Sequence, residues 1–160
     1  MRHPLPLVLA ALCLAGCGGG SDSKQAAAPA AAPARTVVRP LDETRRFPPA
    51  NRVDVKVIDD KILGKDFLPG GNLAAYKKGN AEYQMFLVKA SDASQPALWL
   101  LDLKKQMTDP KLNAGFGGYF GMDSGKPIFA FTKNNYLAGI VGLNEKQSDA
   151  VARELAVRIP

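Results

Sequence analysis

The chain has 160 residues, of which 46% are hydrophobic and 22% charged, and its formal net charge is +6 at pH 7. Its one histidine, His3, and its two cysteines, Cys13 and Cys17, all lie within the first 17 residues. The rest of the chain therefore lacks the side chains of a Ser-His-Asp triad, a Cys-His pair, a histidine-bearing zinc site or a histidine haem ligand, which excludes most small hydrolases.

The first residues carry an export pattern. Arg2 gives a short basic start, and an apolar run of about a dozen residues, 5–16, follows with Pro6 as its one interruption. Crossing a hydrocarbon core as a helix takes ~20 apolar residues. The run is too short for that, so it predicts a cleaved signal peptide over residues 1–16 and not a permanent membrane span.

This run ends in Leu14-Ala15-Gly16-Cys17, and these four residues resemble the lipobox of bacterial lipoproteins. The resemblance implies cleavage before Cys17 and lipid on both its sulfur and its amine. Two or more acyl chains meet the requirement for stable anchoring, because one chain alone binds a membrane marginally. In such lipoproteins an Asp directly after the cysteine marks retention in the inner membrane. Gly18 stands there, so the expected location is the outer membrane of the cell envelope, facing the periplasm.

Residues 17–50 are predicted to form a lipidated, flexible tether rich in alanine and proline. Residues 18–34 have no aliphatic or aromatic side chain beyond alanine, so they cannot bury enough apolar area to offset the entropy of ordering. Residues 35–47 fit either a short edge strand through Val37 and Val38 or a solvated linker, and a linker with partial docking is favoured. The folded periplasmic domain is then predicted over residues 51–160.

Three strands are predicted at the start of this domain. Charged and β-branched residues alternate over 52–57, which is typical of a strand with one wet face. A second strand is expected over 73–76, a turn over 78–80 and a third strand over 82–89. Because apolar residues occupy both faces of the third strand, it is expected inside the sheet.

A helix is predicted over about 95–107, with Asp92 or Ser94 as its cap and Pro96 in its first turn. The apolar residues at 98–101 taken alone fit a strand equally well. Asp109-Pro110 is expected to end the helix.

The glycine-rich segment at 115–121, Gly-Phe-Gly-Gly-Tyr-Phe-Gly, is not a nucleotide loop. A P-loop ending at Gly125-Lys126 requires glycine at position 120 and serine or threonine at 127, where Phe120 and Pro127 stand. A dinucleotide-binding fingerprint that begins at Gly115 also requires glycine at position 120. The segment is better explained as an aromatic strand whose glycines allow a backbone or a ring to pack closely.

Residues 126–142 predict a hairpin, because Asn134-Asn135 tolerates the positive φ of a tight turn. In that register Phe129 opposes Ile140 and Phe131 opposes Ala138. Both faces of the hairpin are apolar, so both are expected to be covered. A last helix is predicted after Asn144, which forms a capping box with Gln147. Its core-facing stripe comprises Ser148, Val151, Ala152, Leu155 and Ile159.

This order of elements predicts a single small α+β domain with a mostly antiparallel sheet and two helices packed on one face. The expected function is a non-catalytic binding or assembly role, with an envelope protein, a cell-wall component or an apolar ligand as partner, and with no cofactor or metal. Nucleic acid is not expected, because the 15 basic and 12 acidic residues from position 51 onward form no basic stripe. The candidate ligand or partner face is aromatic, although the same residues also fit a plain core: Phe116, Tyr119, Phe120, Phe129, Phe131 and Tyr136.

The alternative is a small histidine-free carboxylate enzyme acting on an envelope substrate such as glycan, since two acids at the right separation suffice for glycoside hydrolysis. The spacing of the candidate acids selects no pair, and each also fits a solvated surface acid. These candidates are Asp54, Asp59, Asp60, Glu82 and Asp123.

Overall fold

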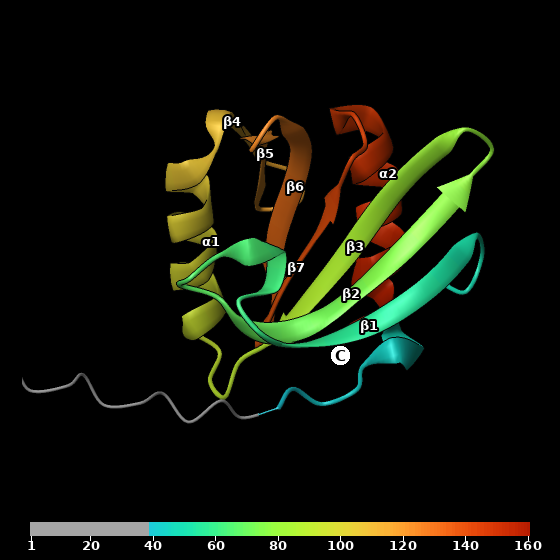
Figure 1. Ribbon diagram of the computed structural model, residues 1–160. Helices are drawn as coiled ribbons and strands as arrows, with labels where there is room; N and C mark the ends of the chain where they lie inside the picture. The colour runs from blue at the N-terminus through green and yellow to red at the C-terminus, as the bar shows by residue number, and fades with distance from the viewer. Residues whose placement is uncertain (1–38) are drawn as a thin grey trace, which may run out of the picture. The chain divides into compact units, whose positions relative to one another are not determined.

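Seven antiparallel strands form one strongly curved sheet (Figure 1) in the order β1-β2-β3-β7-β6-β5-β4. The computed structural model of the protein describes residues 39–160, so the predicted signal peptide, the lipid-bearing Cys17 and most of the tether lie outside the described residues. The strands are β1 (Arg52–Asp60), β2 (Pro69–Lys78), β3 (Ala81–Lys89), β4 (Thr108–Asn113), β5 (Gly118–Asp123), β6 (Lys126–Lys133) and β7 (Tyr136–Val141). The helices are α1 (Gln95–Gln106) and α2 (Glu145–Arg158), with short 3-10 turns η1 (Thr44–Arg46) and η2 (Ile62–Gly64).

The central strand β3 shows how the sheet separates two cores. Its side chains alternate, so that Met85 and Leu87 lie in one buried cluster and Phe86 and Val88 in the other. Because β3 pairs with β2 on one side and β7 on the other, it lies inside the sheet, as its sequence predicts. The predicted α+β class with a mostly antiparallel sheet is therefore confirmed.

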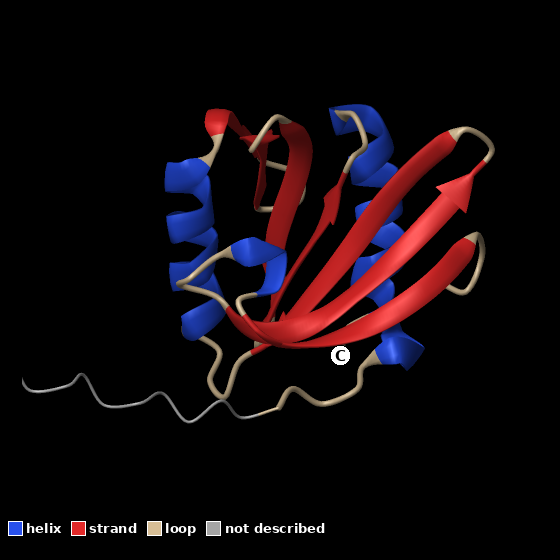
Figure 2. Ribbon diagram, viewed as in Figure 1, coloured by secondary structure: helices blue, strands red, loops and turns tan. Residues whose placement is uncertain are grey.

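The prediction that both helices pack on one face is wrong. Leu100 and Leu103 of α1 lie in the cluster that contains Phe86, whereas Leu155 of α2 lies in the cluster that contains Met85. The two helices therefore cover opposite faces of the sheet (Figure 2). A hairpin that is apolar on both faces needs a cover on each side, and the two helices supply one each.

The predicted register of the β6–β7 hairpin is confirmed. Phe129 pairs with Ile140 and Phe131 with Ala138, and Asn134 adopts the positive φ, 52°, that the tight turn requires. Gly139 allows close packing here, because a Cβ at this position would overlap the carbonyl oxygen of Phe129 and the ring of Phe86.

The helix predicted over about 95–107 is confirmed over Gln95–Gln106. Ser94 occupies the N-cap position, and the side chain of Asp92 supplies the capping acceptor. The Asp92 carboxylate accepts hydrogen bonds from the backbone N–H groups of Ser94 and Gln95, both at 2.9 Å. The helix ends at Gln106. Asp109 and Pro110 lie within β4, an edge strand that the sequence did not predict.

Helix α2 follows its predicted pattern. The side chain of Asn144 accepts a hydrogen bond from the backbone N–H of Gln147 at 3.0 Å, which gives the first half of the capping box. The stripe that begins at Ser148 is buried or packed against the core. On the exposed side of α2, Asp149 and Arg153 form an ion pair one helical turn apart, with Arg153 Nε 3.0 Å from the Asp149 carboxylate.

Residues 39–50, here called the N-terminal arm, pack against the domain. Phe47 is 1% exposed and belongs to the core on the α2 face, and Glu43 is 4% exposed. The Glu43 carboxylate accepts hydrogen bonds from the Tyr136 hydroxyl at 2.9 Å and from Arg46 Nε at 2.8 Å. The packed part of the chain therefore starts before the predicted boundary at residue 51, because the arm supplies a core aromatic and a buried acid.

Candidate functional site

Four of the five candidate acids of the enzyme alternative lie beside basic side chains, and the fifth, Asp60, is the last residue of β1. Asp59 lies 3.5 Å from Arg39, and Asp123 lies 2.7 Å from Lys65. Asp54 and Glu82 have lysine partners as well, Lys56 and Lys77, at 4.0 and 2.8 Å respectively.

The environment of Glu82 does not suit the role of a general acid. The hydrogen bond from Lys77 lowers the pKa of the Glu82 carboxyl, whereas a general acid needs a raised pKa.

The predicted aromatic face is divided between the core and its edges. Phe129, Phe131 and Tyr136 are at most 1% exposed and lie beneath α2. Phe116 and Phe120 are half-buried at the edge of the same core. Tyr119 lies on the other face, where the Lys104 ammonium is 4.6 Å from its ring centroid. The set is mainly structural and does not form one open surface.

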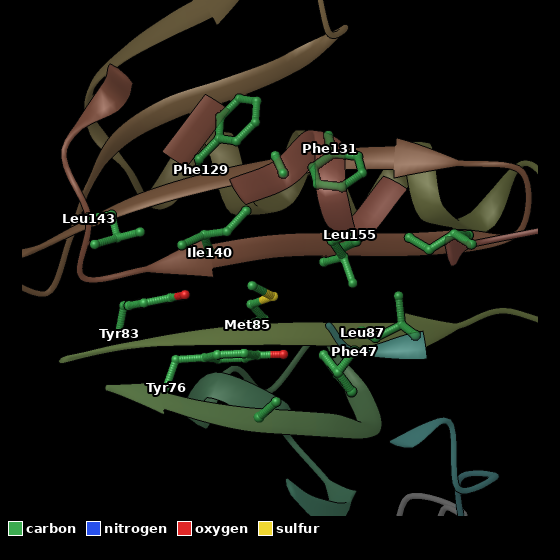
Figure 3. Packing of buried hydrophobic residues seen from close by; sticks show 14 of the residues in the cluster. Phe47, Tyr76, Tyr83, Met85, Leu87, Phe129, Phe131, Ile140, Leu143 and Leu155 are labelled. Atoms are coloured by element: carbon green, nitrogen blue, oxygen red, sulfur yellow. The ribbon is translucent and has the colours of Figure 1, made fainter. Parts of the chain in front are cut away.

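A different pair of aromatics lines an open hollow. Tyr76 and Tyr83 stack with their ring centroids 5.0 Å apart (Figure 3), at the end of the core cluster where β2 turns into β3. Between this hairpin and α2 lies a cleft of about 380 Å³, here called the tyrosine cleft. Its apolar lining includes Met85, Leu143 and Val151, and polar side chains such as Lys78 and Glu154 contribute to its wall.

The walls of the tyrosine cleft combine apolar groups with a few polar ones. Burial raises the pKa of both tyrosine hydroxyls above its ordinary value. The Tyr76 hydroxyl donates to the carbonyl oxygen of Pro48 at 2.8 Å and is thereby fixed. Cleft volumes of ~300 Å³ and above, with mostly apolar walls and a few polar groups, are typical of small-ligand sites.

A second hollow lies at the other end of the sheet, beside the N-terminal arm. It measures about 530 Å³, and we call it the arm groove. Residues of the arm, of β2, of the β3–α1 connection and of α1 line it, among them Arg39, Leu41, Lys89 and Trp99.

Sequence reasoning missed the tyrosine cleft, although the pairing of its two tyrosines could have been predicted. The turn at Gly79 fixes the register of the β2–β3 hairpin, and in that register Tyr76 and Tyr83 are direct cross-strand partners. The position of α2 opposite this hairpin is a tertiary feature, so the hollow between them has no sequence signature.

Two further properties of residues 39–160 bear on function. No helix in this range is both long and apolar enough to cross a membrane. No group of three or more potential metal-ligating side chains occurs in this range either.

Comparison with known proteins gives a similarity of fold. No protein-family model matches the chain, and no curated protein matches it. Among solved structures, the crystal structure of a protein described as a GTP binding regulator from Thermotoga maritima is similar, with a TM-score of 0.50 and 20% sequence identity. The similarity covers 72% of this chain and 79% of the Thermotoga chain. At this identity it shows a shared fold and nothing about ligands.

Proposed function

We propose that this protein is a lipid-anchored, non-catalytic binding module of the bacterial cell envelope. Lipid on Cys17 holds it at the outer membrane, and the tyrosine cleft binds an apolar group of an envelope ligand or partner protein. The observation that carries the binding role is the cleft itself, an apolar hollow about 380 Å³ in volume at the open end of a core cluster. The sequence around Leu14-Ala15-Gly16-Cys17 supports the anchor.

The chemistry of the described side chains supports binding over catalysis. The cleft offers rings, a thioether and aliphatic groups, and the chain after residue 17 has neither histidine nor cysteine to act as base or nucleophile. Binding of an apolar group needs neither, since burial of its surface supplies ~25 cal/mol per Å².

Titration with 8-anilinonaphthalene-1-sulfonate, an anionic dye with an apolar ring system, tests the cleft. The protein is the mature chain from residue 17, carrying Cys17→Ser and made without the leader, so that it bears no lipid. We expect saturable, one-site binding to the folded protein. Ala150→Glu places a carboxylate on the wall of the cleft from an exposed helix position. We expect it to weaken dye binding about tenfold, because a dye in the cleft would cover this carboxylate and bring its own sulfonate near it. A tenfold loss corresponds to only ~1.4 kcal/mol.

Val157→Glu is the matched control. Val157 lies on the same helix, is 84% exposed and is not part of the cleft, so this variant should bind the dye like the parent chain. A parent chain that shows no saturable binding, or an Ala150→Glu chain that binds as well as the Val157→Glu chain, would contradict a binding role for the cleft.

A further inference from the structure

The arm groove lies where the chain from the lipid anchor enters the domain. Arg39, the first described residue, lines the groove together with Leu41 of the arm and Trp99 of α1. The Glu43 and Phe47 contacts fix the arm to the sheet. The point at which the tether meets the domain is therefore fixed beside this groove.

The side chains of the arm groove are those that membrane interfaces favour. Leu41 is 65% exposed, and Trp99, the one tryptophan of the chain, is half-buried. Arg39 and Lys89 add two basic groups whose side chains are 79% and 40% exposed. Exposed aliphatic groups, tryptophan and basic side chains together are typical of surfaces that rest in the headgroup region of a bilayer.

Each of the two basic side chains of the arm groove lies beside one acidic side chain. Asp59 lies 3.5 Å from Arg39, and its side chain is 64% exposed. An exposed ion pair of this kind contributes ~0–1 kcal/mol, so Arg39 can exchange Asp59 for a phosphate at little cost. The guanidinium also matches a phosphate in a two-point contact. Lys89 lies 3.6 Å from Glu43, whose carboxylate retains its Tyr136 and Arg46 partners if the lysine moves.

The length of the tether keeps this groove near the membrane. Residues 18–38 comprise 21 residues between the lipid-bearing cysteine and Arg39. A chain segment of 21 residues reaches at most ~75 Å in any conformation, and linkers that hold two sites within such a reach raise the local concentration of a tethered site to the order of millimolar. Even if the affinity of the arm groove for lipid is weak, lipid then occupies the groove for much of the time.

We infer that the arm groove docks on the membrane surface by binding anionic phospholipid headgroups of the leaflet that holds the Cys17 lipid. This inference rests on the proposed lipid anchor. The β2–β3 turn, which borders the tyrosine cleft, lies at the opposite end of the sheet from the β3–α1 connection (Figure 1). Docking at the arm groove therefore directs the cleft away from the membrane, toward partners in the periplasm.

The fluorescence of Trp99 tests this docking directly, because the chain has no other tryptophan. The mature chain from residue 17 with Cys17→Ser, made without the leader, is mixed with phosphatidylcholine vesicles that contain or lack phosphatidylglycerol. We expect the emission to shift to shorter wavelength and the protein to sediment with the anionic vesicles only, and added salt to reverse both effects. Arg39→Gln should lower the partition coefficient about fivefold, the usual effect of one basic residue near an anionic surface.

Leu112→Ser serves as the matched control for Leu41→Ser. Leu112 is 60% exposed on β4 and does not line the arm groove, so its loss should leave vesicle binding unchanged, whereas loss of Leu41 should weaken it. Three results would overturn the inference: no response to anionic vesicles, equal weakening by the two serine variants, or the same Trp99 shift with inorganic phosphate alone. None of these results bears on lipid attachment or on dye binding in the cleft, so a failure here is distinguishable from a failure of the proposed function.

Discussion

Replacing Phe47 by alanine tests whether the N-terminal arm is part of the folded domain. Phe47 is 1% exposed and packs in the core cluster on the α2 face. Truncation of a buried phenylalanine to alanine costs ~3–5 kcal/mol, and small domains have a total stability of ~5–15 kcal/mol. We therefore expect Phe47→Ala to remove a large share of the stability and to lower the melting temperature by on the order of 10 °C or more.

The assay is urea and thermal unfolding of the unlipidated mature chain, followed by circular dichroism. Leu41→Ala is the control, because Leu41 lies in the same arm but is 65% exposed, and such surface changes stay within ~0.5 kcal/mol. A loss of less than ~1 kcal/mol in Phe47→Ala would refute the reasoning, since the arm would then be attached to a domain that folds without it.

Three further predictions concern an acid, a glycine and pH. Burial raises the pKa of the Glu43 carboxyl, but the hydrogen bonds from Tyr136 and Arg46 and the charges of Arg46 and Lys89 outweigh it, so the pKa in the fold lies below its ordinary value of 4.5. An acid whose pKa is lowered in the fold stabilises the fold at pH values above its pKa in the unfolded chain, and this stabilisation is lost as the pH falls through its pKa in the folded protein. Glu43→Gln should therefore lower the free energy of unfolding at pH 7 and reduce the loss of stability on acidification below about pH 5. An unchanged dependence of stability on pH in the acid range would contradict this. Gly139→Ala should destabilise by ~1–3 kcal/mol or more through overlap with Phe129 and Phe86, whereas Gly115→Ala, where a Cβ meets only ordinary contacts, should unfold in urea like the parent. Because the chain after residue 3 has no histidine, dye binding in the cleft should vary little between about pH 5.5 and 8, and a steep transition there would favour the carboxylate enzyme.

Local patterns predicted those elements whose partners are close in the sequence. The β6–β7 register follows from two apolar runs that flank Asn134-Asn135, and the pairing of Phe129 with Ile140 agrees with it. Helix α2 follows from Asn144 and from an apolar stripe at helical spacing. In each case the turn or cap residue and the apolar period indicate the same structure, which is the condition for reliable prediction.

The missed features depend on tertiary contacts. An apolar stripe shows that a helix packs on a sheet but not on which face, so the opposite placement of α1 and α2 was not predicted. Strand β4 is nearly all exposed, contains Pro110 and a bulge, and has no alternating pattern. Glu43 is an ordinary linker acid in the sequence, and only its contacts with Tyr136 and Asn72, 93 and 29 positions away, identify it as part of the core.

The candidate site was the least predictable part. Phe129 and Phe131 have the same residue type and spacing whether they form a core or a binding face, and burial beneath α2 assigns them to the core. The tyrosine cleft arises where the β2–β3 hairpin and α2 diverge, and no local pattern encodes that divergence.

The covalent state of the N-terminus tests the central claim of a lipid-anchored module most directly. Mass spectrometry of the protein isolated from bacterial membranes should find Cys17 as the first residue, with the added mass of acyl chains on its sulfur and amine. Incorporation of a labelled fatty acid should disappear in Cys17→Ser and persist in Cys13→Ser. An N-terminus at any other residue, an unmodified Cys17, or label retained in Cys17→Ser would contradict the account.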